Sequence, residues 1–421
     1  MYCEVFDEII SIMHNDYSGH LDKKGWDNPE KFKSKILNMT ADGSLTQDKF
    51  VEIVNDYLVD FKDKHVYFTI KNNEIRDIGF RTRRFKNRLY VTKSDDNTDL
   101  ETGDAILALD YEPIGDLAVR HSRELLDSIH ERENWTPIIS KYSTCTTEKK
   151  DGSIHTFDLT AHQSRFNPIP FRRTWLDDAT LLLRLPSFSD TEKANSFIRR
   201  HEEEISRACN MIVDVRQNAG GNAQSFKGLL PYLYPEGDNT VKLEQSRQLF
   251  NCTKRNAELT KRLVSRFIKT LDDKEAEKDL SDYITNMYDN VGEGFRFLDE
   301  EDEVISISGT RYPKKVVALS DVTSGSATEG FLELCKDSPK ATVVGRATAG
   351  VNVYSNLVIE EWAGLFELYY PTSKMPERPD GNAISEWDAA VKPDINIPWN
   401  PRHITEDPDL EAAMVFIDRS H

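Results

Sequence analysis

The chain has 421 residues, of which 38% are hydrophobic and 30% are charged, and its formal net charge is −18 at pH 7. This length predicts two or three domains with a sizeable core, and the acidic balance disfavours nucleic acid and anionic membrane surfaces as partners. The sequence has no run of about 18 apolar residues, so we expect no membrane span.

The start of the sequence and its five cysteines both favour a cytoplasmic protein. Residues 1–7 lack the basic and apolar regions of a signal peptide, although an exported form with a trimmed leader stays open. The cysteines are scattered and odd in number, which is typical of reduced thiols, and none has the spacing of a zinc ligand pair. We therefore expect neither a disulfide framework nor a metal site.

Residues 1–72 are predicted to form a helical N-terminal region that ends in a strand. Apolar residues between positions 50 and 61 follow the spacing of an amphipathic helix, and Ser44 with Gln47 has the pattern of a capping box before it. His65 comes directly after this helix and before a strand-like run at residues 66–70. A histidine in such a turn is more often structural than catalytic, so other segments must decide its role.

Residues 73–168 have the pattern of a small β-rich domain. Ile78-Gly79-Phe80 precedes one strand-like run, and residues 100–110 contain a Gly-Asp turn that feeds another. These two segments resemble the carboxylate-binding loop and the L-x-x-GD-x-IL segment of PDZ domains. The resemblance implies that N–H groups at Ile78, Gly79 and Phe80 bind the C-terminal carboxylate of a peptide, which then adds a strand to the sheet. The alternative is a degenerate domain that serves only packing.

Residues 169–421 alternate between strand-like and helical patterns. Apolar runs at residues 180–185 and 211–215 flank a helical stretch, which predicts two parallel strands joined by a crossover helix. The second run leads into Gly220-Gly221, where backbone N–H groups can approach a ligand closely.

A strongly charged helical insertion is predicted around residues 234–302. Leu259 and Leu263 are expected on the inward face of one of its helices. We interpret the insertion as a cap over a cleft or as a subunit contact.

Ser326 lies between two apolar, β-branched runs at residues 316–319 and 342–345. The runs predict buried strands, and helical spacing starts at Ala327, so Ser326 is expected where a strand turns into a helix. There its hydroxyl can point into a cleft, and free N–H groups of the helix N-terminus can stabilise a developing negative charge. For this segment alone, a serine that only caps the helix is the commoner interpretation.

Several separated segments together resemble the tail-specific, or C-terminal processing, serine peptidases, in the branch that includes the tricorn core protease. The resemblance implies a ClpP/crotonase-like α/β catalytic core with a PDZ-like domain and a small helical N-terminal domain. In the segment Phe61 to His65, Lys64 replaces the glycine of the family pattern. The segments are Asp214 to Gly221 (D-Φ-R-x-N-x-GG), Ser324 to Glu329 (S-x-S-A-x-E), Val344 to Gly350 (VG-x-x-T-x-G), Val391 to Ile395 (V-x-PD-Φ) and Phe61 to His65 (L-x-D-G-H).

The resemblance also implies a nucleophile and an oxyanion hole. Ser326 is the implied nucleophile. For acyl transfer, a serine nucleophile needs an adjacent base and two hydrogen-bond donors aimed at the tetrahedral intermediate. The implied donors are the backbone N–H of Ala327 and that of Gly220 or Gly221.

The implied base is His65, as in the Ser-His-Glu branch of the family. A Ser–Lys site is disfavoured, because no lysine occurs between Lys340 and Lys374. The third member of the triad is expected near the tail motif, where Glu386 is preferred and Asp388 is the alternate.

The predicted function is that of a serine endopeptidase that cuts peptides or unstructured proteins, with selection of a free C-terminus by the PDZ-like domain. No cofactor is expected, and a homo-oligomer is compatible with the sequence. One alternative is a catalytically silent family member that binds peptides or ligands, which Lys64 and the blurred acid position motivate. Crotonase-type acyl-CoA chemistry is a further alternative, but it leaves the serine motif and the PDZ-like segments unexplained.

Overall fold

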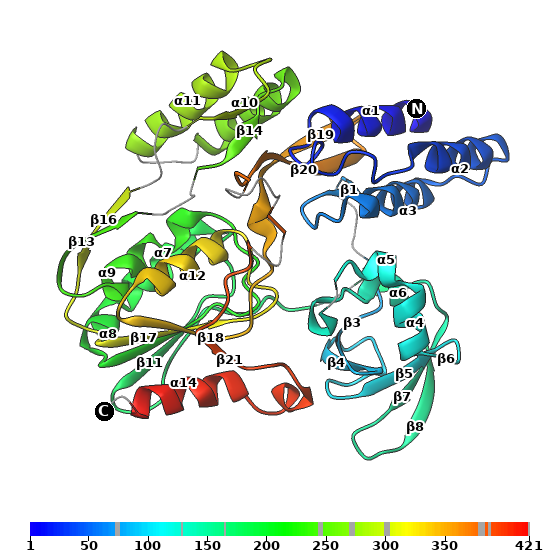
Figure 1. The fold of residues 1–421 in the computed structure, drawn as a ribbon. Helices are drawn as coiled ribbons and strands as arrows, with labels where there is room; N and C mark the ends of the chain where they lie inside the picture. The colour runs from blue at the N-terminus through cyan, green and yellow to red at the C-terminus, as the bar shows by residue number, and fades with distance from the viewer. Residues whose placement is uncertain are drawn as a thin grey trace. The chain divides into compact units, whose positions relative to one another are not determined.

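The structure is a computed structural model, and contacts divide the chain into two units (Figure 1). The first unit comprises Met1–Asn73, Lys242–Val304 and Val351–Ala389, and the second comprises Glu74–Val241, Ile305–Gly350 and Ala390–His421. Across the described residues, no helix combines the length and the apolarity needed to cross a membrane. The described residues are 1–71, 76–127, 129–163, 166–242, 247–268, 274–298, 304–377, 384–385 and 389–419.

The first unit packs three N-terminal helices against an antiparallel sheet. Their apolar faces join the sheet in one core, in which Phe50 contacts Phe68 and Phe366 edge to face. In the sheet, β20 pairs with β1, β14 and β19, and β14 pairs with β15. The elements are α1 (Tyr2–Asn15), α2 (Pro29–Ala41), α3 (Gln47–Leu58), β1 (Tyr67–Ile70), β14 (Leu249–Asn251), α10 (Lys254–Ile268), α11 (Lys274–Asp289), β15 (Phe295–Phe297), β19 (Tyr354–Trp362) and β20 (Phe366–Lys374).

Two details of this unit differ from the sequence predictions. Thr46, not Ser44, caps α3 by accepting the Lys49 N–H at 3.2 Å, so the predicted capping box is wrong. On α10, Leu259 is 5% exposed and joins the core of the unit, whereas Leu263 is 39% exposed. The prediction of Leu263 on the inward face is therefore also wrong, because the residue lies one turn beyond the part of α10 that enters this core.

The PDZ-like part of the second unit is a twisted antiparallel sheet with short helices (Figure 1). Phe80, Leu89 and Ile106 point into its core with Trp135. The elements are β2 (Arg76–Asp77), β3 (Phe80–Phe85), β4 (Arg88–Ser94), β5 (Ala105–Leu109), β6 (Glu112–Pro113), α4 (Ile114–Arg120), α5 (Ser122–Leu125), α6 (Thr136–Ile139), β7 (Thr144–Glu148), β8 (Ile154–Asp158) and β9 (His162–Gln163).

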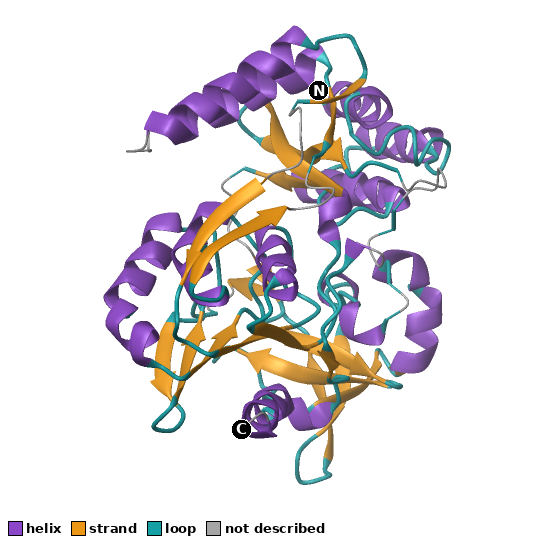
Figure 2. Ribbon diagram, turned by 60° about the vertical axis from the view of Figure 1, so that its left-hand side comes forward, coloured by secondary structure: helices purple, strands orange, loops and turns teal. Residues whose placement is uncertain are grey.

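The remainder of the second unit is the ClpP/crotonase-like α/β core. Its sheet has the order β10-β11-β12-β17-β18-β21, and every neighbouring pair except β10–β11 is parallel, which confirms the predicted strand–helix–strand unit. Helix α14 covers one face of the sheet, and α7 and α12 lie on the other (Figures 1 and 2). The elements are β10 (Arg172–Trp175), β11 (Thr180–Arg184), α7 (Thr191–Arg200), α8 (Glu202–Arg207), β12 (Asn210–Asp214), α9 (Leu230–Leu233), β17 (Lys315–Ser320), α12 (Ala327–Asp337), β18 (Ala341–Gly345), β21 (Ile395–Asn396) and α14 (Pro408–Arg419), besides the pair β13 (Gly237–Lys242) and β16 (Val304–Gly309).

The parallel strands bring three motif loops to one edge of the core sheet. In register, Asp214 of β12 lies beside Leu319 of β17, which lies beside Val344 of β18. The loops that follow these strands carry Gly220, Ser326 and the Thr348 motif. Ligands of α/β sheets usually bind in crevices outside the carboxyl ends of parallel strands, so we expect the functional site at this edge.

Candidate active site

Ser326 occupies a strained turn between β17 and α12. Its backbone has φ 54° and ψ −125°, which is a sparsely populated conformation for a residue with a side chain. Such strain is retained where the surrounding structure imposes it, and it is concentrated at functional sites. Ser326 is the N-cap of α12, but its backbone differs from the extended conformation of an ordinary capping serine.

Gly220 approaches Ser326 from the loop after β12. A Cβ at Gly220, where φ is 102°, would lie 2.6 Å from the Gly325 carbonyl oxygen and 2.7 Å from the Ser326 Cβ. The same Cβ would lie 3.0 Å from the backbone nitrogen of Ala327. The structure thus brings together Ser326, Ala327 and Gly220, and only a glycine allows this approach.

The two glycines of this loop differ in the use of their N–H groups. The Gly220 N–H donates to Oδ1 of Asn218 at 3.0 Å, whereas the described residues offer no acceptor to the N–H of Gly221 or to that of Ala327. Gly221, with φ 136°, packs so closely on Phe188 that a Cβ would lie 2.2 Å from the Phe188 carbonyl carbon. Gly220 therefore permits close packing, and Gly221 and Ala327 retain the available donors.

Glu329 connects the Ser326 turn to two other motif segments. Its fully buried carboxylate accepts the Ser326 N–H at 3.2 Å, the Thr348 hydroxyl at 2.5 Å and the Gly350 N–H at 2.6 Å. The Thr348 hydroxyl in turn accepts the Val391 N–H at 2.8 Å. Sequence reasoning matched Glu329 and Thr348 to motifs without assigning them a role, and their buried hydrogen bonds now supply one.

Replacing Glu329 with glutamine should lower the free energy of unfolding by about 1–3 kcal/mol, because one amide group then faces donors that the carboxylate accepted. We also expect a lower kcat, since the Ser326 turn loses its anchor. Urea unfolding and peptide-cleavage kinetics measure both effects. Glu203→Gln, on an exposed site of α8, is the matched control. Equal stability of the two variants would contradict this role of Glu329.

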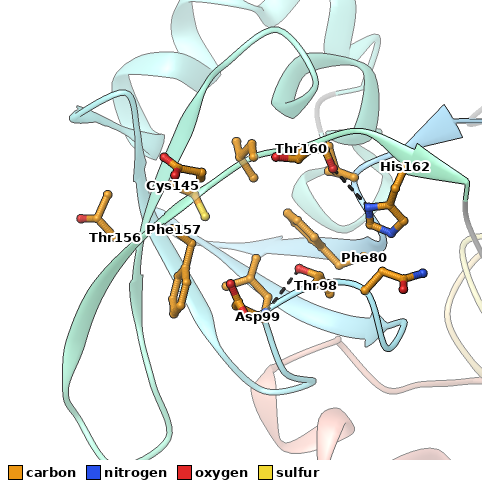
Figure 3. A pocket seen from close by; sticks show the side chains of 13 residues that line it. Phe80, Thr98, Asp99, Cys145, Thr156, Phe157, Thr160 and His162 are labelled. Atoms are coloured by element: carbon orange, nitrogen blue, oxygen red, sulfur yellow. Dashed lines mark hydrogen bonds between the residues drawn. The ribbon is translucent and has the colours of Figure 1, made fainter.

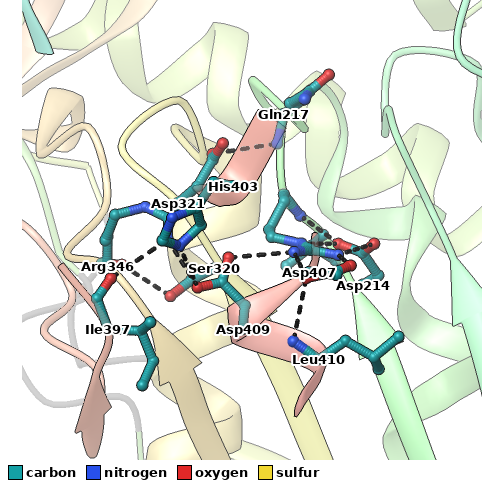
Figure 4. A network of polar contacts seen from close by, with 12 residues as sticks. Asp214, Gln217, Ser320, Asp321, Arg346, Ile397, His403, Asp407, Asp409 and Leu410 are labelled. Carbon is teal, nitrogen blue, oxygen red and sulfur yellow. Dashed lines mark hydrogen bonds and ion pairs between the residues drawn. The ribbon is translucent and has the colours of Figure 1, made fainter. Parts of the chain in front are cut away.

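Asp321 joins the loop after β12, which carries Gly220, to the loop after β17, which carries Ser326 (Figure 4). Its Oδ1 accepts the N–H groups of Gln217 at 3.1 Å and Thr323 at 3.0 Å, and its Oδ2 lies 3.0 Å from Nη2 of Arg83. Burial acts to raise the pKa of Asp321, but the charges of Arg83 and Arg346 outweigh it and hold the pKa well below its usual range. Asp321 is therefore ionised, and its hydrogen bonds to Gln217 and Thr323 hold the two loops together.

A second buried carboxylate, Asp409, joins the helix α14 to the same network (Figure 4). Its oxygens lie 2.7 Å from Nη1 of Arg346 and 3.1 Å from Nη1 of Arg216, with Nε2 of His403 at 3.3 Å. Burial acts to raise the pKa of Asp409, but the hydrogen bond with His403 and the charge of Arg346 lower it from 3.8 to about 2. The C-terminal helix is thereby tied to the strand ends that carry the site.

This depressed pKa makes stability depend on acid pH. A carboxyl whose pKa is lower in the folded chain stabilises the fold above its unfolded pKa of 3.8 and loses that contribution as the pH falls through about 2. The contribution of Asp409 is roughly 2 kcal/mol. Denaturant unfolding between pH 5 and about 2 should show this loss, and Asp409→Asn should show a shallower pH dependence. An unchanged slope in that variant would contradict the assignment.

His65 lies in the first unit, in the turn between α3 and β1. Its side chain is half-buried, its Nδ1 lies 2.7 Å from the Tyr354 carbonyl oxygen, and its backbone N–H donates to Asp63 at 2.9 Å. Ser326 belongs to the second unit, so the pairing of His65 with Ser326 stays a prediction. Glu386 and Asp388 lie outside the described residues, and their roles stay predictions too.

The predicted carboxylate loop of the PDZ-like domain borders a cavity of about 340 Å³ (Figure 3). Ile78 and Phe80 line this cavity, while the Gly79 N–H donates to Oδ1 of Asp77 at 2.7 Å. Arg81 holds the other oxygen of Asp77 at 2.6 Å. A peptide carboxylate at Gly79 would have to displace this internal one, so binding there stays a prediction.

The core matches a known family of proteolytic enzymes. A family model described as peptidase family S41 matches residues 179–397, which is slightly more than half of the chain. The chain belongs to peptidase family S41. This S41 chain is accordingly a serine peptidase, and its substrates are peptides or proteins.

Solved structures share the fold of this S41 peptidase at low sequence identity. Mature CPAF complexed with lactacystin aligns with a TM-score of 0.61 and 12% identity, over 100% of this chain and 97% of that chain. Mature CPAF alone aligns with a TM-score of 0.60 and 13% identity, over 98% of this chain and 95% of that chain. A search of curated proteins finds no match. These likenesses concern the fold, and the roles of individual residues must come from the site itself.

Proposed function

We propose that this S41 peptidase cleaves peptide bonds with Ser326 as nucleophile and His65 as general base. The observation that carries the proposal is the strained Ser326 turn at the start of α12, with Gly220 packed against it. In this arrangement the Ser326 hydroxyl attacks the scissile carbonyl carbon and gives its proton to Nε2 of His65. The imidazolium then protonates the leaving amine, and an acyl-Ser326 ester remains, which water hydrolyses in a second, equivalent cycle.

The proposed oxyanion hole uses the N–H groups of Ala327 and Gly221. Both are available among the described residues, whereas Asn218 already occupies the N–H of Gly220. The Ala327 N–H also lies at the N-terminus of α12, where the helix dipole favours negative charge. Two aimed donors lower the barrier because they bind the tetrahedral intermediate more strongly than the planar carbonyl.

The proposed substrates are peptides or unstructured segments of proteins, selected by a free C-terminus through the PDZ-like domain. The support is the sheet and loop at Ile78 to Phe80, beside the cavity of about 340 Å³. Glu386, with Asp388 as alternate, remains the acid that the family resemblance implies for the triad.

Labelling with a fluorophosphonate probe tests the proposed nucleophile, because such probes phosphonylate an activated serine. Mass spectrometry of the labelled chain should find the adduct on Ser326, and His65→Ala should abolish labelling. Ser196, a partly exposed serine of α7 whose hydroxyl donates to Glu192, should stay unlabelled as an internal control. An adduct on another serine, or labelling that does not need His65, would contradict the proposal.

A further inference from the structure

A buried polar cluster lies directly behind His65 in the first unit. We call Tyr17, Lys23 and Asp63 the Asp63 cluster, and their exposed fractions are 0%, 6% and 7%. The Tyr17 hydroxyl donates to Oδ2 of Asp63 at 2.7 Å and accepts from Nζ of Lys23 at 2.8 Å. The other carboxylate oxygen of Asp63 accepts the His65 N–H at 2.9 Å. The cluster therefore fixes the backbone from which the His65 side chain projects.

The acceptor for the His65 ring is equally well fixed. Nδ1 of His65 lies 2.7 Å from the carbonyl oxygen of Tyr354, the first residue of β19. The Tyr354 hydroxyl donates to Oδ2 of Asp22 at 3.1 Å, and Nζ of Lys23 lies 4.2 Å from the centre of the Tyr354 ring. Tyr354 is thus held at its side chain as well as through the strand pairing of β19 with β20.

A carbonyl oxygen only accepts hydrogen bonds, so this contact sets the tautomer of His65. The neutral ring must carry its proton on Nδ1, which leaves the lone pair on Nε2. Within the described residues of the first unit, Nε2 has no hydrogen-bond partner, as a general base requires. In the Ser-His-Asp triad, this orienting role belongs to a carboxylate that holds Nδ1–H.

We propose that the main-chain carbonyl of Tyr354 orients His65 in this peptidase, and that neither Glu386 nor Asp388 is needed for that purpose. Tyr354 acts as a positioning residue on the ring, and Asp63 acts as a positioning residue on the backbone. The inference rests on the proposed function of His65 as the base. It replaces the tail acid that the family resemblance implies with an acceptor that the structure itself presents.

Substitution of the tail acids tests the inference by kinetics. Glu386→Gln, Asp388→Asn and the double variant should each lower kcat for peptide cleavage by less than about tenfold, because the Tyr354 carbonyl still fixes the tautomer. A loss approaching about 10⁴-fold in any of them, as when the carboxylate of a Ser-His-Asp triad is replaced, would overturn the inference. The proposed function would survive that result, since its own tests are the labelling of Ser326 and the loss of activity in Ser326→Ala and His65→Ala.

Nitrogen NMR of the full chain, with ¹⁵N-labelled histidine, reports which ring nitrogen of His65 carries the proton. A purely structural role of the Tyr354 carbonyl or the tail acids would not change this tautomer. The His65 signals are assigned by their loss in His65→Gln. For the neutral ring, we expect a protonated Nδ1 and an unprotonated Nε2, both in the wild type and in the Glu386→Gln/Asp388→Asn variant. A proton on Nε2 in the wild type, or a tautomer that changes when the tail acids are replaced, would overturn the inference.

The Asp63 cluster is tested with two graded variants. Asp63→Asn should lower kcat by about 10- to 100-fold with little change in KM, because the ring orientation is less well defined. Tyr17→Phe keeps the packing of the ring and removes one hydrogen bond to Asp63, so it should give a smaller loss and serves if Asp63→Asn does not fold. Glu52→Gln, on the exposed side of α3, is the matched control. A folded Tyr17→Phe variant with unchanged kcat and unchanged His65 signals would contradict the role of the cluster.

Discussion

Replacement of Ser326 with alanine should lower kcat/KM for a cleavable peptide by about 10⁴- to 10⁶-fold, the largest effect that we expect from any substitution in this chain. The reason is that the hydroxyl forms the acyl bond, so no covalent path remains. The residual rate comes from substrate binding and the oxyanion donors alone. Alanine has the same Cβ as serine, so the substitution leaves the backbone strain at position 326 unchanged. We therefore expect the circular dichroism spectrum to show an intact fold.

Ser324→Ala is the matched control within the same motif. The buried Ser324 hydroxyl donates to the Val215 carbonyl at 3.1 Å and accepts the Asp321 N–H at 3.1 Å, so it braces the loop. Its removal should lower the free energy of unfolding by about 1–3 kcal/mol while kcat/KM falls by no more than about tenfold. If Ser324→Ala were the inactive variant and Ser326→Ala the active one, the nucleophile assignment would be wrong.

Gly220→Ala should lower kcat/KM by at least about 10²-fold, the second largest effect that we expect among the variants of the second unit. The new Cβ would lie 2.6 Å from the Gly325 carbonyl oxygen and 2.7 Å from the Ser326 Cβ, and φ at this position is 102°. Both the clash and the strained φ push the Gly220 loop away from Ser326. We therefore also expect a loss of roughly 2–4 kcal/mol in the free energy of unfolding.

Gly330→Ala provides the comparison for this glycine variant. Gly330 lies inside α12, only four residues after Ser326, and an added Cβ would meet nothing within 4 Å. Alanine in a helix interior should raise the free energy of unfolding by about 0.5–1 kcal/mol and leave kcat/KM unchanged. Peptide cleavage and urea unfolding of both variants distinguish the clash of a new Cβ beside Ser326 from the general effect of replacing a glycine with alanine. Equal kcat/KM for Gly220→Ala and the wild type would contradict the proposed site.

Much of the core could be predicted because its signals are local. Apolar runs of five or six residues around a helical stretch predicted parallel strands, and the structure confirms them as β11 and β12. Parallel strands end at one edge, so the approach of the Gly220 loop to Ser326 follows from the same pattern.

Features that depend on distant contacts escaped prediction. The sequence did not decide whether Gly220 or Gly221 supplies the oxyanion donor. In the structure the Asn218 side chain accepts the Gly220 N–H, so among the described residues the Gly221 N–H is the one that stays available. The bond from Nδ1 of His65 to Tyr354 spans 289 residues, and the bond from Tyr17 to Asp63 spans 46, so no local pattern could indicate either. The same holds for residues 242–304, which join the N-terminal helices in one unit. Hydrophobic periodicity shows which face of a helix is apolar, but not which distant segment covers it.

A double-mutant cycle on Ser326 and His65 tests the central claim most directly, because it asks whether the two residues act as one device. The measurement is kcat for one peptide in the wild type, Ser326→Ala, His65→Ala and the double variant. If the hydroxyl and the imidazole work together, the double variant should be no slower than the slower single variant, since either loss disables the same step. Losses that multiply in the double variant would show two independent roles and would contradict the account.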